Sequence, residues 1–299
     1  MRFKWSFCSV AATALLAASH VQAWTVTIDC ESSSAGSVLQ GAGGFNDSAS
    51  KTVVSTTNVV SGRHSCATTI RKDTSGWAEF GGRKVLPSKL VKGDSVWVKL
   101  DLFLPKDFDF NSYSAGNRLK FMRFHTKSNA PAEFCKGKNE GYVDWLIYPT
   151  YKIFGDAGFG IIQECQQMWR EFGSYSGGVH MKTGEWQTYE MHVVFDNIPW
   201  SRGGDGLIRV WRNDELITEI TDITTLRTAS SWSDSFLLFT YWNGNAPKTQ
   251  TLYFDDLIIT NEKPAGRDSK GNPRIGRSAA VSARSVPTVP SAPENVKLE

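Results

Sequence analysis

Short runs in which hydrophobic and polar residues alternate recur along most of the chain. The clearest run is SVWVKLDLFLP, residues 95–105, in which every second residue is Val or Leu. A period of two is typical of a β-strand with one buried face. The side chains predicted to lie in the core are Val96, Val98, Leu100, Leu102 and Leu104. The opposite face carries Trp97, Lys99, Asp101 and Phe103.

The strand-like runs are separated by turn residues, and no segment shows a convincing helical period. Asn213-Asp214 joins two of the runs and predicts a hairpin turn. We therefore predict an all-β fold, a two-sheet antiparallel jelly roll with a concave binding face. The predicted strands are residues 24–30, 66–73, 95–105, 118–126, 160–166, 186–196, 206–214, 215–220, 235–242 and 251–260.

The first 23 residues have the composition of a secretory leader. Arg2 and Lys4 precede an apolar run that ends in Val21-Gln22-Ala23, a small-residue cleavage site. The apolar run is too short to span a membrane. We predict a protein secreted to the extracellular space or periplasm, with no membrane partner.

Residues 265–299 contain no aromatic residue and are rich in Ser, Pro, Arg and Gly. This composition predicts a linker or disordered tail after a single domain at residues 24–264. The tail has a net charge of +3 and the leader a net charge of +2. Because the net charge of the whole chain is +3, the domain between them has a net charge of −2. A nucleic-acid partner is not expected without a basic folded face. We expect a monomer, and the tail is of the kind that leads into a further domain.

Four cysteines remain after the leader, an even number that predicts disulfides in an oxidising compartment. Three pairings are possible. Cys30–Cys66 and Cys135–Cys165 are favoured because each closes a short loop. No C-x-x-C pair is present, so a thiolate metal site is not expected.

The predicted strand RLKFMRFHT, residues 118–126, carries an unusual number of cations. Arg118 and Lys120 share one parity, whereas Arg123 and His125 share the other, so the pairs face opposite sides unless a β-bulge intervenes. The pattern would need no ligand if these residues lie at a solvent-exposed strand edge, where the Lys and Arg side chains extend their charged ends into water. The alternative is an anionic ligand, because Arg offers a planar fork to a carboxylate and His titrates near neutrality.

Two other strands carry candidate ligand-binding residues. Tyr241 and Trp242 lie where the strand of residues 235–242 runs into a loop, a position from which side chains reach a cleft. Tyr241 is a candidate proton donor or base. The alternative role for Tyr241 is packing in the core with its hydroxyl hydrogen-bonded. Gln163 interrupts an apolar strand and is a candidate for binding a carboxylate or hydroxyl. The alternative role for Gln163 is a structural one, in which its side chain forms a hydrogen bond to a neighbouring strand.

Asp255 and Asp256 interrupt the last predicted strand, and Glu31 directly follows the first. First and last strands often lie side by side in jelly rolls, so Glu31 is expected to meet Asp255 or Asp256. Carboxylates with backbone oxygens form Ca²⁺ sites, and we predict a structural calcium ion here. Solvent-facing acids are the alternative.

Several catalytic motifs are absent. The chain has no G-x-S-x-G, no H-E-x-x-H, no phosphate-binding loop and no E-x-D-x-x-E run. No strand offers an obvious carboxylate pair for glycoside hydrolysis.

Four segments of the chain resemble the jelly-roll polysaccharide lyases: RLKFMRFHT, TGEWQTYEMHVVFD, DGLIRVWRNDELITEI and FTYWNGNAPKTQTLYFDDLIIT. The nearest groups are glucuronan lyase and its relatives and the heparin lyase I-like group, and the resemblance covers residues 24–262. It implies a concanavalin A-like sandwich with catalytic residues on the concave sheet. It also implies a Ca²⁺ site away from that sheet, held by Glu31, the Ser61 region and Asp255. The Q-x-H motif of related alginate lyases is absent. His64, His180 and His192 are therefore alternatives to His125 as the functional histidine.

The resemblance predicts a polysaccharide lyase that acts on a uronate-containing, anionic polysaccharide. Such an enzyme removes a proton α to a carboxylate, and a cation must offset the charge that develops. Arg123 is assigned to that role, with Arg118, Lys120, Gln163 and Trp242 binding substrate, and with His125 and Tyr241 moving protons. The competing functions are a non-catalytic carbohydrate-binding domain and a glycoside hydrolase.

Overall fold

The described part of the chain is built from β-strands and loops. The computed structural model describes residues 22–47, 51–77, 80–109, 118–129, 140–149, 157–163, 168–171, 181–196, 204–226, 228 and 230–277. These residues form sixteen strands in two antiparallel sheets, which confirms the predicted all-β jelly-roll class. None of them forms a helix of the length and hydrophobicity needed to cross a membrane.

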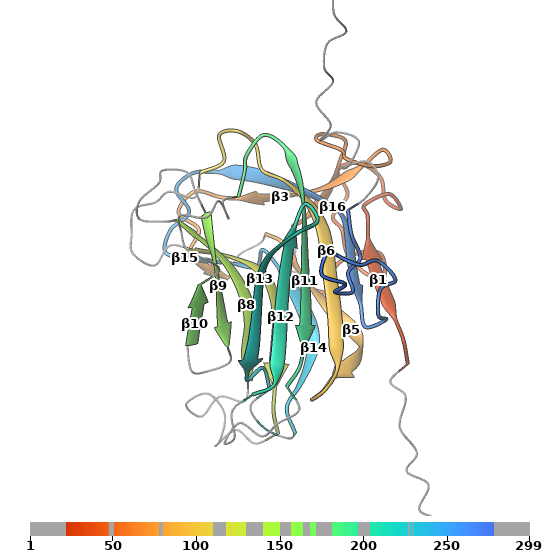
Figure 1. The fold of residues 1–299 in the computed structure, drawn as a ribbon. Helices are drawn as coiled ribbons and strands as arrows, with labels where there is room; N and C mark the ends of the chain where they lie inside the picture. Colours follow the sequence, from red (N-terminus) through yellow and green to blue (C-terminus); the bar gives the residue numbers. More distant parts are fainter. Residues whose placement is uncertain are drawn as a thin grey trace, which may run out of the picture.

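The first sheet, here called sheet I, has the strand order β13-β12-β11-β6-β16-β3-β2, with β1 also paired to β16 (Figure 1). The strand β6 lies near its middle, between β11 and β16. The bounds are β1 Thr25–Ile28, β2 Val53–Ser55, β3 Ser65–Ile70, β6 Ser95–Phe103, β11 Trp186–Val194, β12 Gly206–Arg212, β13 Glu215–Ile223 and β16 Gln250–Thr260.

The second sheet, here called sheet II, has the order β10-β9-β8-β7-β14-β5, and the short strand β15 pairs with both β7 and β4. The strand β7 contains the cation-rich segment of the sequence. The bounds are β4 Gly76–Trp77, β5 Gly82–Leu90, β7 Arg118–Lys127, β8 Glu140–Pro149, β9 Ala157–Gln163, β10 Met168–Glu171, β14 Trp232–Leu238 and β15 Tyr241–Asn243.

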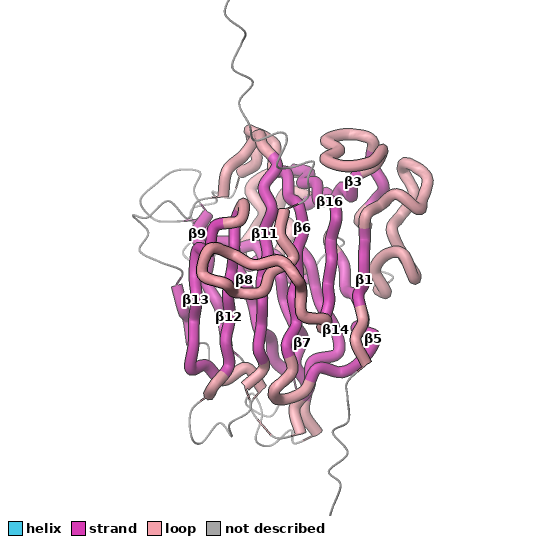
Figure 2. Tube along the Cα trace, turned by 45° about the vertical axis from the view of Figure 1, so that its right-hand side comes forward, coloured by secondary structure: helices cyan, strands magenta, loops and turns pink. Residues whose placement is uncertain are grey.

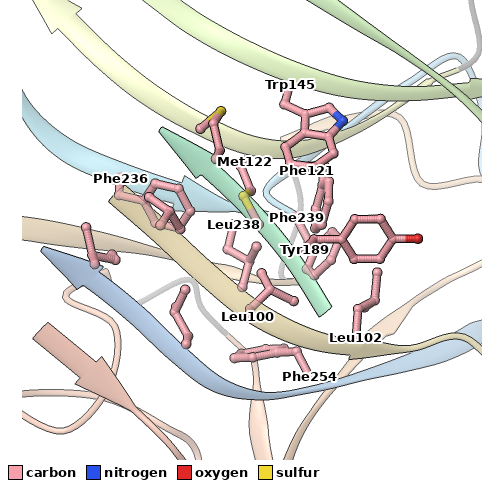
Figure 3. Packing of buried hydrophobic residues seen from close by; sticks show 14 of the residues in the cluster. Leu100, Leu102, Phe121, Met122, Trp145, Tyr189, Phe236, Leu238, Phe239 and Phe254 are labelled. Atoms are coloured by element: carbon pink, nitrogen blue, oxygen red, sulfur yellow. The ribbon is translucent and has the colours of Figure 1, made fainter. Parts of the chain in front are cut away.

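Hydrophobic side chains from both sheets meet in one core (Figure 3). Phe121 of β7 packs edge-on against Tyr189 of β11, with ring centroids 5.6 Å apart. Phe124 of β7 and Phe195, just after β11, make a second contact at 6.0 Å. Because these contacts join the inner faces of the two sheets, side chains of opposite parity lie on the outer faces.

The local predictions that concern the core are confirmed. The five alternate Val and Leu side chains of residues 95–105 are all at most 2% exposed. Asn213 and Asp214 join β12 to β13 with φ of 48° and 75°, which fits the tight hairpin turn expected between them. The predicted disulfide Cys30–Cys66 is present. Cys135 and Cys165 lie outside the described residues.

Residues 265–277, here called the C-terminal strap, cross the outer face of sheet I (Figure 2). The Trp97 indole N–H donates to the Pro273 carbonyl, and the Trp211 indole N–H donates to Asp268. Glu190 of β11 accepts hydrogen bonds from the Ile275 and Gly276 amides. The composition of residues 265–299 predicts a tail, whereas this part of it is packed, because the sheet supplies the aromatic rings that the strap lacks.

We expect a chain that ends at residue 264 to be less stable than one that ends at residue 277. Loss of the strap exposes Trp97 and Trp211, which are 3% and 1% exposed, and removes their hydrogen-bond partners. The expected loss is on the order of 2 kcal/mol in the free energy of unfolding, measured by urea denaturation. Equal stability of the two chains would contradict this role of the strap.

Candidate active site

A β-bulge in β7 brings its basic residues to one face. The register of β7 with β8 shifts between Lys120 and Met122. Phe121 and Met122 are both fully buried in the core, so the two residues of the bulge share the inner face. Lys120 before the bulge, and Arg123 and His125 after it, therefore lie together on the outer face of sheet II. Without the bulge, the parity of the sequence would place them on opposite sides.

The acid that balances these cations comes from the neighbouring strand β8. Asp144 lies between the core residues Val143 and Trp145 and so faces outward. Its carboxylate is 2.8 Å from Lys120 Nζ and 2.6 Å from Arg123 Nε. Burial alone would raise the pKa of Asp144, but the charges of Arg123 and Lys120 outweigh it and hold the pKa below its ordinary value. Two buried cations thus share one carboxylate.

Arg123 also contacts aromatic rings. Its guanidinium carbon lies 3.9 Å from the ring centroid of Tyr142 and 5.4 Å from that of Trp77. Arg123 is only 3% exposed, and its Nη1 has no hydrogen-bond partner in the part of the chain that the structure describes. A buried guanidinium N–H without a partner is costly, so this donor is available for an anionic ligand that reaches it.

After a break between β14 and β15, the pairing of Trp242 with Leu119 places Tyr241 across from Lys120. Phe239 has φ of 51°, stacks on Phe121 at 5.1 Å, and donates its N–H to the Phe121 carbonyl at 3.1 Å. A side chain at Gly81 would lie 1.9 Å from the Leu238 carbonyl, so the break requires glycine there. The chain then resumes as β15 and turns the half-buried Tyr241 ring to the outer face.

The ring of Tyr241 packs edge-on against Trp77 at 5.8 Å, and the two residues pair across β15 and β4. Trp77 is 55% exposed, which is unusual for a tryptophan in a strand. An exposed indole on the same face as cations can stack on the apolar face of a sugar ring. Trp77 could not be recognised from the sequence, because a two-residue strand leaves no alternation to detect.

The prediction that Trp242 binds substrate is corrected. Trp242 is 1% exposed and belongs to the hydrophobic core. Its neighbour Tyr241 faces outward, and consecutive residues of a strand point to opposite faces, so both cannot contact a ligand. Trp77 provides the aromatic surface that was expected from Trp242.

His125 lies further along the same face. Its ring stacks on Tyr142 at 4.9 Å. Five residues separate His125 from Lys120, which corresponds to roughly 15 Å of strand. This distance is longer than one sugar ring, so the structure does not bring His125 and Tyr241 to the same bond of a polysaccharide. The other histidines that were candidates for the functional histidine do not lie on this face in the described structure. His192 is on the outer face of sheet I, and His64 lies beside Glu31. His180 is outside the described residues.

Two further candidates are placed only by their backbone. Arg118 is the first residue of β7, opposite Asn243 of β15. Gln163 is the last residue of β9, next to Ile162, which pairs with Asp144. Their side chains lie outside the described part of the structure.

The predicted calcium ligands gather around the loop that contains Ser61. Asp255 accepts a hydrogen bond from the Ser61 amide, and Asp256 accepts one from the Ser61 hydroxyl. Glu31 accepts hydrogen bonds from the amides of Arg63 and His64. Burial, with the neighbouring Asp256 charge, raises the pKa of Asp255 to about 7. Asp256 has φ of 48° at a bulge in β16, which turns the acids toward the loop. Across the described residues, no group of three or more His, Cys, Asp or Glu side chains is arranged to hold a metal ion.

Comparison with known proteins decides the family. A family model described as polysaccharide lyase matches residues 24–257, most of the chain. The chain belongs to the polysaccharide lyase family. A search of curated proteins found no match for the lyase.

Solved structures share the fold of the lyase at low sequence identity. Alginate lyase Aly36B is 16% identical with a TM-score of 0.56, covering 79% of this chain and 96% of that one. Endo-beta-1,4-glucuronan lyase from the fungus Trichoderma reesei is 12% identical with a TM-score of 0.53, covering 78% and 93%. Alginate lyase vAL-1 from Chlorella virus is 16% identical with a TM-score of 0.52, covering 76% and 99%. At such identities the likeness shows the fold alone.

Proposed function

We propose that this polysaccharide lyase is an exported enzyme that cleaves a 4-linked uronate polysaccharide by β-elimination on the outer face of sheet II. The observation that carries the proposal is the pair of buried cations, Lys120 and Arg123, which both bind the Asp144 carboxylate on the face that also carries Tyr241 and Trp77. Such a face favours an anionic sugar chain. The alginate and glucuronan lyases that share the fold support a uronate substrate.

In β-elimination, a base removes the proton on C5 of the uronate, the C4–O4 bond breaks, and a C4=C5 double bond forms. The C5 proton is weakly acidic until the charge that develops on the carboxylate is offset. Arg123 Nη1 and the Lys120 ammonium are the cations assigned to that carboxylate. Because they are buried and held by Asp144, they stabilise the developing charge without reorganising.

Tyr241 is the group assigned to proton transfer. The register of β15 with β7 places Tyr241 across from Lys120 on the outer face, and Trp77 packs edge-on against the Tyr241 ring. When the C5 proton and O4 leave from the same side of the ring, one tyrosine that enters the step as its phenolate can accept the C5 proton and then donate it to O4, which leaves the phenolate again. His125, about 15 Å further along β7, is assigned to binding a neighbouring sugar.

The proposal is tested by incubating the protein with a panel of polyuronates and with a neutral glucan. A lyase produces the unsaturated uronate, which is read by its ultraviolet absorbance. We expect absorbance to rise with at least one polyuronate and not with the glucan. Retention on a polyuronate without any rise in absorbance would replace the enzyme by a carbohydrate-binding domain.

We also propose that Ca²⁺ binds at Glu31, Ser61 and Asp255 as a structural ion. The donor set is made of oxygens, which calcium prefers, and backbone carbonyls or water would complete its coordination. A cation there would offset the buried Asp255 charge, which is otherwise disfavoured. The site lies on sheet I, away from Tyr241, so the ion would stabilise the fold rather than take part in the reaction.

We expect a chelator to lower the melting temperature by about 5 °C and added Ca²⁺ to restore it. The measurement is thermal denaturation of the wild type and of Asp255→Asn. The substituted protein should melt at one temperature with or without calcium. A wild type that does not respond to chelator or calcium would refute the site.

A further inference from the structure

A second charged group lies on the outer face of sheet II, nearer its β5 edge. We call it the Arg83 patch, and it consists of Arg83, Lys89, Lys127, Trp232 and Asp234. A bulge in β14, between Ser233 and Ser235, displaces Asp234 from the regular pairing with β7 and β5. Lys127 and Trp232 pair across β7 and β14, so their side chains share one face.

Asp234 is the centre of the patch. Lys127 Nζ lies 2.8 Å from its carboxylate, and Arg83 Nη2 lies 3.9 Å from it. Burial alone would raise the pKa of Asp234, but the hydrogen bond and charge of Lys127 outweigh it and lower the pKa. The Lys89 ammonium lies 4.0 Å over the ring of Trp232. Asp234 is therefore ionised at neutral pH and holds two of the three cations.

The patch has an excess of positive charge that solvent can reach. Among the described residues the patch holds three cations and one carboxylate, of which Arg83 and Lys127 contact Asp234, and the side chains of Arg83 and Lys127 are 37% and 30% exposed. The Nε of Arg83 has no hydrogen-bond partner within the described ranges. Partly exposed cations in surplus over their acids attract anions, and a nearby aromatic ring suits a sugar.

The patch and Arg123 are held by carboxylates on different strands, because Arg83 and Lys127 pair with Asp234 of β14 whereas Arg123 pairs with Asp144 of β8. Lys127 follows Arg123 by four residues on β7, which corresponds to about 13 Å of strand. Arg83 lies in the same cross-strand row as Arg123, with Leu237 of β14 between them, so two strand spacings of roughly 5 Å each separate them. A carboxylate bound at the patch therefore belongs to a different sugar of the chain that Arg123 holds.

We propose that the Arg83 patch is a second uronate-binding subsite. It takes the carboxylate of a sugar beyond the one whose bond is cleaved, so the substrate must carry more than one uronate. This inference rests on the proposed function, because both sites are assigned to one polysaccharide. Arg83 and Lys127 bind the second carboxylate, and Asp234 sets how much positive charge remains for it.

The test measures KM and kcat of Arg83→Gln, Lys127→Gln and Asp234→Asn on a polyuronate that the wild type cleaves. We expect KM to rise about fivefold in each of the first two proteins, with kcat unchanged. Asp234→Asn removes the acid and leaves both cations, so its KM should fall. A role confined to stability would not give opposite signs. The salt dependence of KM should weaken in Arg83→Gln and Lys127→Gln.

The matched control is Arg209→Gln, which removes a cation paired with Glu219 from the outer face of sheet I. Its KM should equal that of the wild type. An active wild type whose KM is unchanged by Arg83→Gln and Lys127→Gln would overturn the subsite while leaving the proposed function standing. A wild type inactive on every polyuronate would instead overturn the proposed function, and with it the subsite.

Discussion

Replacing Tyr241 by Phe is expected to lower kcat by about 10²–10⁴-fold and to change KM little, because the substitution removes a proton-transfer group. The ring remains, so its edge-on contact with Trp77 should persist and the fold should be unchanged. The measurement is steady-state kinetics on the polyuronate that the wild type cleaves. The melting temperature of the substituted protein checks that it is folded.

Two controls make the Tyr241 result specific. Tyr253→Phe removes a hydroxyl from the outer face of sheet I and should leave kcat unchanged. His125→Ala should change kcat by less than about tenfold, because we place His125 at a neighbouring sugar. A loss in His125→Ala as large as that in Tyr241→Phe would assign the base to His125. A Tyr241→Phe protein with wild-type kcat would contradict the assignment of Tyr241.

Replacing Asp144 by Asn is expected to lower the free energy of unfolding by about 3–5 kcal/mol, because it removes the carboxylate that pairs with two buried cations. Lys120 and Arg123 are 8% and 3% exposed, so water cannot solvate them fully. The measurement is urea denaturation at neutral pH. Catalytic activity should also fall, because both cations lose the carboxylate that positions them.

The pH dependence of stability gives a second readout for Asp144. Its pKa in the folded protein lies below the ordinary value of 3.8, so the folded state binds its proton less readily than the unfolded state. The stability it contributes is therefore complete above about pH 4 and is lost as the pH falls through the folded-state pKa. The difference in the free energy of unfolding between the wild type and Asp144→Asn should become smaller below about pH 4.

Asp234→Asn is the matched control for Asp144→Asn. Its carboxylate also pairs with a cation, but the side chains of Asp234 and Lys127 are 23% and 30% exposed. We expect a loss of less than about 1 kcal/mol there. Equal losses in Asp144→Asn and Asp234→Asn would show that burial of the Asp144 pairs does not carry the stability we assign to it.

The elements with clear periodicity were predictable from the sequence. Alternating Val and Leu residues mark the core face of β6, and Asn213-Asp214 marks the turn between β12 and β13. These features depend on local preferences alone. The Cys30–Cys66 disulfide was predictable for a similar reason, because a short loop favours that pairing.

The candidate site was predictable only in part. The sequence identified Arg123, Lys120 and Tyr241, but the β7 bulge that unites their faces depends on pairing with β8. Asp144 was missed because its partners lie on another strand, and cross-strand neighbours are not adjacent in sequence. The Trp242 prediction was wrong because it chose both members of an adjacent pair, of which a strand can expose only one.

The packing of the C-terminal strap was not predictable from composition. Residues 265–277 lack aromatic side chains, yet Trp97 and Trp211 of sheet I bond to their backbone and side chains. Glu190, whose pKa burial raises to about 7, accepts two of the amides of the strap. A segment without its own core can be ordered when a sheet provides the apolar surface.

The central claim, β-elimination of a uronate chain, is tested most directly by comparing two kinds of chain end in one digest. Each elimination produces one unsaturated uronate and one new reducing end, whereas each hydrolysis produces a reducing end alone. We predict that the wild type generates the two in equal numbers and that Tyr241→Phe generates both about 10²–10⁴-fold more slowly. Reducing ends without unsaturated ends would contradict the account and make the enzyme a hydrolase.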